Sequence, residues 1–266
     1  MRISSFIIIA SLFFSGCSLI PDQIDNTKNW SASKFYSEGK KSLAEGDFEE
    51  AIKYYEQLEA RFPFGKYAQQ AQVEIAYAYY KYDEPASALI ASDRFIKQHP
   101  RHPHVDYLYY LKGLVNFNAG KDLISKYIPQ DPTQRDPGAA RASFDDFSVL
   151  VRKFPNSKYS KDARQRMLFL RNNLAEYEIH VARYYMKREA YLAASNRAKY
   201  VVENYQKTTA VPKALSIMAS AYQSIGLDNL SKDAMRVLMK NYPNYKDGAA
   251  TQTSTEESSW IPWKPF

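Results

Sequence analysis

The sequence contains little glycine and almost no cysteine. Of its 266 residues, nine are glycine, three are tryptophan and one is cysteine. A single cysteine excludes an intramolecular disulfide framework and a cysteine-rich zinc module. So few glycines argue against most sandwiches, barrels and dinucleotide-binding folds, which need glycine at many turns. The hydrophobic content of 45% is nevertheless enough for the packed core of one large domain or two ordinary ones.

The sequence is rich in tyrosine and has more positive than negative charge. The chain has 22 tyrosines and 14 phenylalanines, and its formal net charge is +7. Much of the core must therefore be aromatic, although tyrosine is also a favoured residue on binding surfaces. The positive charge would suit nucleic acid, anionic lipid or an acidic protein face, and by itself it does not decide between them.

The first seventeen residues have the pattern of an export signal. Arg2 precedes a largely apolar run, Ile3 to Phe14, which is too short to span a bilayer, and Ser15-Gly16-Cys17 follows. This stretch resembles the bacterial lipoprotein signal, which implies removal of residues 1–16 and attachment of a diacylglycerol and a fatty acyl chain to Cys17. Ser18, in place of aspartate, implies transport to the outer membrane, with the protein facing the periplasm. The alternative is an ordinary signal peptide with an incidental cysteine.

Both ends of the mature chain are polar and lack periodicity. Residues 17–31 are expected to form a lipidated tether, and residues 246–266 a disordered tail. The tail ends in Trp-Ile-Pro-Trp-Lys-Pro-Phe, either a docking peptide for a partner or incidental aromatics on a loose end.

Between these ends a spacing of twelve residues recurs. The repeated positions are Gly39, Ala51 and Pro63; Ala76, Ala88 and Pro100; Ala182, Ala194 and Gln206; Ala219, Ser231 and Pro243; and, in part, Ser143 and Pro155. The intervening segments have helical periodicity. Small residues at helix crossings and proline after the second helix are typical of the tetratricopeptide repeat, two antiparallel helices in about 34 residues.

The spacing predicts an all-α fold, a tetratricopeptide-repeat superhelix of about five helical hairpins. The expected helix pairs are 33–45/48–61, 69–82/85–98, 104–119/139–153, 160–187/190–205 and 212–225/228–241.

Two irregularities interrupt the array. The third unit carries an inserted loop, 119–138, and the fourth begins with a long helix without proline or glycine, 160–187, which would connect two halves rigidly. We therefore divide the array into an N-terminal half, 32–157, and a C-terminal half, 158–245.

Several strings are similar to the BamD (ComL) family, the lipoproteins of the outer-membrane barrel-assembly (BAM) complex. The strings include Arg61-Phe62-Pro63-Phe64-Gly65-Lys66-Tyr67, Arg135-Asp136-Pro137 within the inserted loop, and Val151-Arg152-Lys153-Phe154-Pro155-Asn156-Ser157. The resemblance covers residues 15–243. It implies a scaffold that binds the POTRA domain of BamA and accessory Bam lipoproteins, and that recognises the C-terminal strands of unfolded outer-membrane proteins.

The resemblance also implies a basic contact. Arg197 occupies the position of the family's main basic contact to BamA, and Arg183, Lys187 and Arg188 would extend that cationic face. A guanidinium can bind a carboxylate of the partner through two hydrogen bonds. The alternative for these four charges is an ordinary solvated helix face.

The first helices of superhelical repeats line the concave side, where a peptide could bind. The expected groove residues are Tyr36, Lys40, Gln70, Tyr77, Tyr80, Lys81, Tyr107, Tyr110 and Phe117. Phenol rings would bind the apolar strand, and Lys40 or Lys81 would bind its terminal carboxylate. The alternative is packing between helices, which we expect for at least half of this set.

No catalytic or metal-binding pattern is evident. The sequence lacks a phosphate-binding loop, a nucleophile elbow and an HExxH motif. His99, His102 and His104 cluster in a proline-rich junction without the rigidity that a metal site needs, and His180 stands alone. We expect no enzyme activity and no cofactor beyond the lipid, and export argues against nucleic acid as partner. The alternative function is a peptidoglycan-associated periplasmic lipoprotein that scaffolds cell-wall enzymes.

Overall fold

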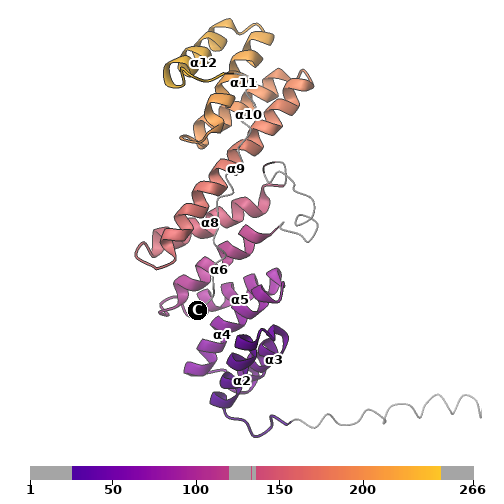
Figure 1. Ribbon diagram of the computed structural model, residues 1–266, viewed down its shortest axis with the longest axis vertical. Coiled ribbons are helices and arrows are strands. Elements are labelled where there is room, and N and C mark those ends of the chain that lie inside the picture. Colours follow the sequence, from indigo (N-terminus) through magenta and orange to yellow (C-terminus); the bar gives the residue numbers. More distant parts are fainter. Residues whose placement is uncertain (1–25, 120–132, 134–135, 247–266) are drawn as a thin grey trace, which may run out of the picture. The chain divides into compact units, whose positions relative to one another are not determined.

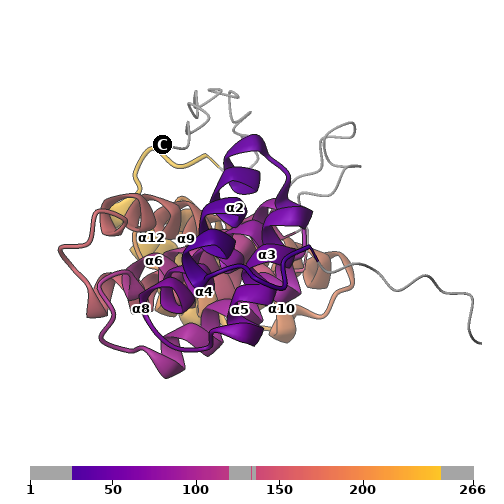
Figure 2. The same cartoon turned by 90° about the horizontal axis from the view of Figure 1, so that it is seen from below.

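The computed structural model describes residues 26–119, 133 and 136–246 (Figure 1). Cys17 and the signal, most of the tether and of the inserted loop, and the tail beyond Lys246 lie outside these residues. Within the described part of the chain all regular elements are helices (Figure 1 and Figure 2).

The helix bounds follow the repeat spacing. The helices are α2 (Ala32–Glu45), α3 (Phe48–Arg61), α4 (Lys66–Lys81), α5 (Pro85–Gln98), α6 (Val105–Asn118), α8 (Gly138–Lys153), α9 (Ser160–Lys187), α10 (Tyr191–Asn204), α11 (Ala210–Ser224) and α12 (Asp228–Asn241). Each bound differs from its prediction by three residues or fewer. The all-α, tetratricopeptide-type fold is therefore confirmed.

Contacts divide the chain into two units, Met1–Ala71 and Gln72–Phe266, with the boundary inside α4. In the first unit α2 packs against α3. In the second, α6 packs against α5 and α8, while α10 and α11 pack against each other. The proposed division between residues 157 and 158 stays a prediction.

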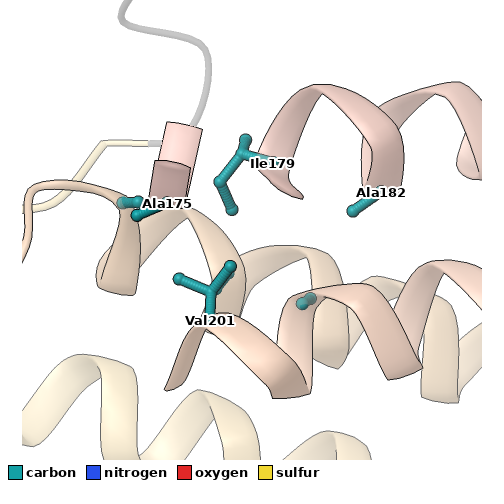
Figure 3. Close-up of a cluster of buried hydrophobic side chains, with 7 residues drawn as sticks. Ala175, Ile179, Ala182 and Val201 are labelled. Carbon is teal, nitrogen blue, oxygen red and sulfur yellow. The ribbon is translucent and has the colours of Figure 1, made fainter. Parts of the chain in front are cut away.

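The long helix α9 joins neighbouring hairpins in the second unit. It packs against α8 and also against α10 and α11. Its C-terminal part contributes Ala175, Ile179 and Ala182 to a core that also includes Val201 of α10, and these four side chains are fully buried (Figure 3). The 28 residues of α9 therefore position α8 and α10 on one rigid element.

The turn between α2 and α3 shows how the sequence ends one helix and begins the next. Gly46 adopts a φ of 83°, and its N–H reaches the carbonyl groups of Leu43 and Ser42. The carboxylate of Asp47 accepts a hydrogen bond from the N–H of Glu50, which caps α3. Glycine after the first helix and aspartate before the second have the roles expected from the sequence.

Two hairpins bring their helices together at a glycine. A Cβ placed on Gly39 would lie 2.6 Å from the Tyr55 ring, and one placed on Gly113 would lie 2.3 Å from the Phe147 ring. Both distances are shorter than any van der Waals contact. The aromatic ring of the second helix therefore fills the space that a side chain on the first helix would need.

A partly buried ion pair network links three helices of the second unit. The Lys112 ammonium on α6 lies 2.8 Å from Asp93 of α5 and 3.1 Å from Asp146 of α8. Burial lowers the pKa of Lys112, but the two carboxylates outweigh this effect and the net pKa is raised. Asn116 donates a further hydrogen bond to Asp146. Lys112 thus fixes α5 and α8 against the same face of α6.

We expect Gly113→Ala to lower the free energy of unfolding by about 2 kcal/mol, because the added methyl group forces the Phe147 ring out of its place. Alanine has the higher helix propensity, so the same change at an unconstrained helix site would stabilise the protein. Urea unfolding measures the difference.

Gly138→Ala is the matched control, since a Cβ on Gly138 meets only the exposed Asp136 carboxylate, at 3.1 Å. Its effect should be within about 0.5 kcal/mol. Combining Gly113→Ala with Phe147→Leu should cost less than the sum of the single changes. A stabilising Gly113→Ala would contradict this account of the crossing.

Candidate partner-binding sites

A buried glutamate holds two arginines in the second unit. Glu178 of α9 is 1% exposed, and its two oxygens each lie 3.1 Å from a guanidinium nitrogen, one of Arg141 on α8 and the other of Arg197 on α10. The arginine side chains are 49% and 47% exposed. This glutamate–arginine cluster (Arg141, Glu178, Arg197) therefore presents two oriented guanidinium groups at the surface.

The helical period explains why Glu178 is buried. Leu174, Ala175, Ile179 and Ala182 form the buried stripe of α9 in this region, and Glu178 lies within that stripe. An ionised carboxylate there is costly unless cations and hydrogen bonds compensate. Arg141 of α8 and Arg197 of α10 supply that compensation, and both helices pack against α9.

The other predicted cationic residues lie elsewhere on α9. At 3.6 residues per turn, Arg183 and Lys187 are about 140° and 180° around the helix from Glu178. Both are exposed. Arg188 ends the helix, and its guanidinium carbon lies 5.4 Å from the centre of the exposed Tyr184 ring. The structure therefore does not bring Arg183 and Lys187 onto the side of α9 where Arg197 is held.

The predicted groove tyrosines of the second unit gather with one residue that the sequence did not indicate. The Tyr110 ring stacks on Tyr159 with centres 4.9 Å apart, and the Tyr107 ring lies 5.5 Å from Tyr159. The Tyr110 hydroxyl donates a hydrogen bond of 2.7 Å to Asp162. Burial raises the pKa of Tyr110, and the bond to Asp162 raises it further. Tyr110 is thus a neutral donor held between α6 and α9.

The remaining phenols of this group are also partly buried. Burial raises the pKa of Tyr107 well above its ordinary value, and the Tyr77 phenol raises it further. The Tyr80 hydroxyl accepts a hydrogen bond of 2.6 Å from Asn118; burial raises its pKa and this bond opposes the rise. We call Tyr77, Tyr80, Tyr107, Tyr110 and Tyr159 the tyrosine cluster. It joins the end of α4 to α6 and the start of α9.

Phe117 and Lys81 lie at the ends of the same helices. The Phe117 ring is 5.8 Å from Phe169, and the Arg166 guanidinium carbon lies 4.8 Å from its centre. Lys81 is exposed. Phe117 therefore packs against α9 as part of the fold.

Three predicted groove residues belong to the first unit. The Tyr36 ring lies 6.2 Å from Tyr55 and 5.6 Å from Tyr67, and the Lys40 ammonium is 6.0 Å from the Tyr36 ring centre. Gln70 is exposed. Tyr36 thus packs between two tyrosines, while Gln70 is open to solvent.

The histidines pack against protein groups. The His99 and His102 rings lie 4.9 Å and 5.0 Å from Phe95, and a ring nitrogen of His99 is 3.2 Å from the Gln72 amide oxygen. In the inserted loop, Thr133 lies 2.8 Å from a ring nitrogen of His180 on α9. The described ranges contain no group of three or more histidine, cysteine or acidic residues arranged to hold a metal ion.

Sequence reasoning missed Arg141, Glu178 and Tyr159. Glu178 left a usable signal, because an acidic residue four positions before the small crossing residue Ala182 falls on the core face and needs a cation. No comparable signal marked Tyr159, which reaches Tyr107 and Tyr110 across about fifty positions of sequence through tertiary packing alone.

None of the helices within the described ranges is both long and apolar enough to span a membrane.

Comparison with known proteins identifies relatives over most of the chain. Residues 28–246 match the family model YfiO, described as an outer membrane lipoprotein. The protein named outer membrane protein assembly factor BamD from Neisseria meningitidis serogroup A is 46% identical over 82% of this chain and 81% of its own length. The protein of that name from Vibrio cholerae is 36% identical over 89% of this chain and 97% of its own. Among solved structures, a crystal structure of MamA gives a TM-score of 0.38 at 14% identity, over 76% of this chain and 92% of that one.

We expect Glu178→Gln to lower the free energy of unfolding by about 2 kcal/mol, because the amide keeps the shape of the side chain but leaves two guanidinium groups without their shared anion. The loss is smaller than for a fully buried pair because both arginines are half exposed. Urea unfolding of the full chain measures it.

Glu203→Gln is the control, since Glu203 is exposed and pairs with Lys199 at 3.6 Å, one turn away on α10. That change should cost less than about 0.5 kcal/mol. Equal losses of unfolding free energy in the two variants would show that the buried carboxylate stabilises the protein no more than an exposed one does.

Proposed function

This chain belongs to the YfiO family of outer membrane lipoproteins, and we propose that it acts as the lipid-anchored scaffold of outer-membrane protein assembly, holding other polypeptides together. Its relatives over four fifths of the chain carry the name outer membrane protein assembly factor BamD. A tetratricopeptide-type array suits this role, because stacked hairpins offer extended surfaces on a rigid frame.

The anchor proposed for this scaffold is Cys17. The sequence before it has the charge, the apolar run and the small residues of a lipoprotein signal. A diacylglycerol and a third acyl chain on Cys17 would bind the membrane firmly, because each buried methylene contributes about 0.8 kcal/mol. The mature protein would then face the periplasm from the outer membrane.

The main contact proposed for BamA is Arg197, with the POTRA domain as its partner. One nitrogen of its guanidinium is hydrogen-bonded to Glu178, and half of the side chain is exposed. A guanidinium has five N–H donors, so the outward edge can bind a partner carboxylate through two bonds. Because Glu178 already fixes the orientation of the group, little side-chain entropy is lost on binding. This half-exposed, oriented arginine is the observation that carries the proposal.

Arg183, Lys187 and Arg188 form a second exposed basic region. Since Arg183 and Lys187 project from a different side of α9 than Glu178, we assign them to a separate contact, either with BamA or with an accessory Bam lipoprotein. Exposed charges of this kind contribute to the rate of association more than to affinity.

The tyrosine cluster is the proposed site for the C-terminal strands of unfolded outer-membrane proteins. Its rings offer apolar area with polar edges, a combination that favours peptide binding. Tyr110 and Tyr80 have hydrogen-bond partners within the protein, so we expect Tyr77, which is half-buried, to contribute most of the contact. Lys81, at the end of the same helix, would meet the terminal carboxylate.

We expect Arg197→Met to reduce capture of a BamA periplasmic fragment at least tenfold, since truncating one member of a desolvated charge pair costs about 2–5 kcal/mol. A pull-down with the full chain in detergent measures the loss. Lys199→Met removes an exposed positive charge from the same helix and should change capture less than twofold.

Thermal unfolding of both variants separates a lost contact from a lost fold. Unchanged capture by a folded Arg197→Met variant would contradict the assigned interface. Binding to isolated sacculi, with no capture of BamA by the unaltered chain, would instead support a peptidoglycan-associated role.

A photo-crosslinking side chain at Tyr77 should label a peptide that ends in phenylalanine with a free carboxylate. The same probe at Ile90, an exposed residue of α5, should label it several-fold less. Mass spectrometry of the products measures both yields. Equal labelling of an amidated, scrambled peptide would remove the recognition proposal.

A further inference from the structure

The last helix of the second unit, α12, has an apolar side that no described helix covers. Within the described part of the chain α12 packs against α11 (Figure 1). The second helices of earlier hairpins pack in addition against the helix that follows them: α5 against α6, α8 against α9 and α10 against α11. Among the described residues, which end at Lys246, α12 has no such successor.

The repeat spacing shows which side of α12 is open. Met235 lies four residues after the small residue of its repeat. The residues at that position in the three preceding second helices of this unit are Ser92, Phe147 and Ala198. Those three side chains are fully buried, whereas Met235 is 40% exposed. Met239, one turn further along α12, is 55% exposed.

The equivalent residues of α10 show what covers this side in an earlier repeat. Ala198 shares a core cluster with Ala214 of α11. Val202, the counterpart of Met239, packs against the cluster that contains Leu215 of the same helix. The two methionines of α12 therefore face the place where the first helix of a further repeat would lie.

The chain beyond Lys246 carries a segment whose composition fits this side. Residues 260–266, Trp-Ile-Pro-Trp-Lys-Pro-Phe, have an aromatic residue at every third position, Trp260, Trp263 and Phe266. The two prolines favour the polyproline II conformation, which has three residues per turn, so the three rings would share one side. Aromatic rings make favourable contacts with the thioether of methionine, whose flexible side chain adapts to its partner.

The length of the intervening chain suits a contact within one molecule. The thirteen residues 247–259 are all polar or small, and they follow closely on the end of α12. A random-coil link of this length would span about 20 Å, and α12 is about 21 Å long. The effective concentration of residues 260–266 at α12 would be on the order of millimolar, which favours them over a separate chain.

Charge favours the same placement. The side chains of α12 include three basic and two acidic groups, whereas those of residues 247–266 include one basic and three acidic groups. Lys232 and Arg236 are exposed and lie within about 60° of Met239 around the helix. Glu256 and Glu257, just before the aromatic segment, would approach these two cations. Exposed pairs of this kind add little affinity, so the aromatic rings supply most of the contact.

We propose that residues 260–266 dock on the Met235–Met239 side of α12 in the same chain and cap the open end of the array. The rings of Trp260 and Trp263 cover the two methionine side chains, as α11 covers the equivalent positions of α10. Terminal repeats need such a cap because their outer apolar side otherwise faces water. This contact goes beyond the proposed function, since it needs no second polypeptide.

Methyl NMR of the full chain in detergent, labelled with ¹³C at the methionine methyl groups, tests the contact. The tryptophan rings should displace the Met235 and Met239 signals, which are assigned from Met→Leu variants. The double change Trp260→Ala and Trp263→Ala should abolish this displacement and leave the signals of the other methionines in place. Ser258→Ala, a change in the same segment of chain, should have no effect.

Cleavage by chymotrypsin gives an independent measurement, because docking protects the bond that follows Trp263. The double change Met235→Ser and Met239→Ser should speed cleavage there by about fivefold or more, since cleavage follows the population of the undocked form. Leu230→Ser with Val237→Ser is the matched control. These two exposed residues project from another side of α12 and should leave the rate unchanged.

Methionine signals that do not respond to loss of the two tryptophans would overturn the proposal. Unlabelled intact chain, added to the labelled variant that lacks the tryptophans, should not restore the displacement. Restoration would show that a second copy is the occupant. Signals that move only when a BamA periplasmic fragment is added would assign this side of α12 to that partner instead.

Discussion

Two hairpins of this protein depend on how closely their helices can approach where they cross. The pairs at these crossings are Gly39 with Tyr55 and Gly113 with Phe147. In each pair an aromatic ring of the second helix fills the space that a side chain on the glycine would occupy. All of the second-helix residues in these pairs are fully buried, as close packing requires.

This constraint is local to each hairpin, which explains why the fold could be predicted from one sequence. Small residues at fixed intervals and the prolines that follow predicted every helix to within three residues. The Gly46-Asp47 turn could be predicted equally well, because glycine ends the first helix and aspartate caps the second. None of these features depends on a residue more than one repeat away, except where the inserted loop separates Gly113 from Phe147.

The candidate sites were less predictable because they depend on contacts between hairpins. Arg197 was indicated by resemblance, but the carboxylate that holds it lies nineteen positions earlier and the second arginine on that carboxylate comes from α8. The sequence analysis assigned Arg183 and Lys187 to the same cationic face as Arg197. The helical periodicity of α9 places both residues on a different side of the helix from Glu178, which holds Arg197. The predicted tyrosines of the second unit lie close together, and the hydrogen bonds of Tyr110 to Asp162 and of Tyr80 to Asn118 show that these two also stabilise the fold. Their role as a peptide groove stays a prediction.

The free energy of folding gives little reason for a glutamate at position 178. A well-packed apolar side chain in the same stripe of α9 would spare the protein the desolvation of a carboxylate, and such replacements are often neutral or stabilising. What an apolar residue could not do is hold the guanidiniums of Arg141 and Arg197 in fixed positions beside one another. One buried anion therefore orients two basic groups that are half exposed at the surface. A scaffold that must bind acidic groups without reorganising has a physical reason to bury that charge.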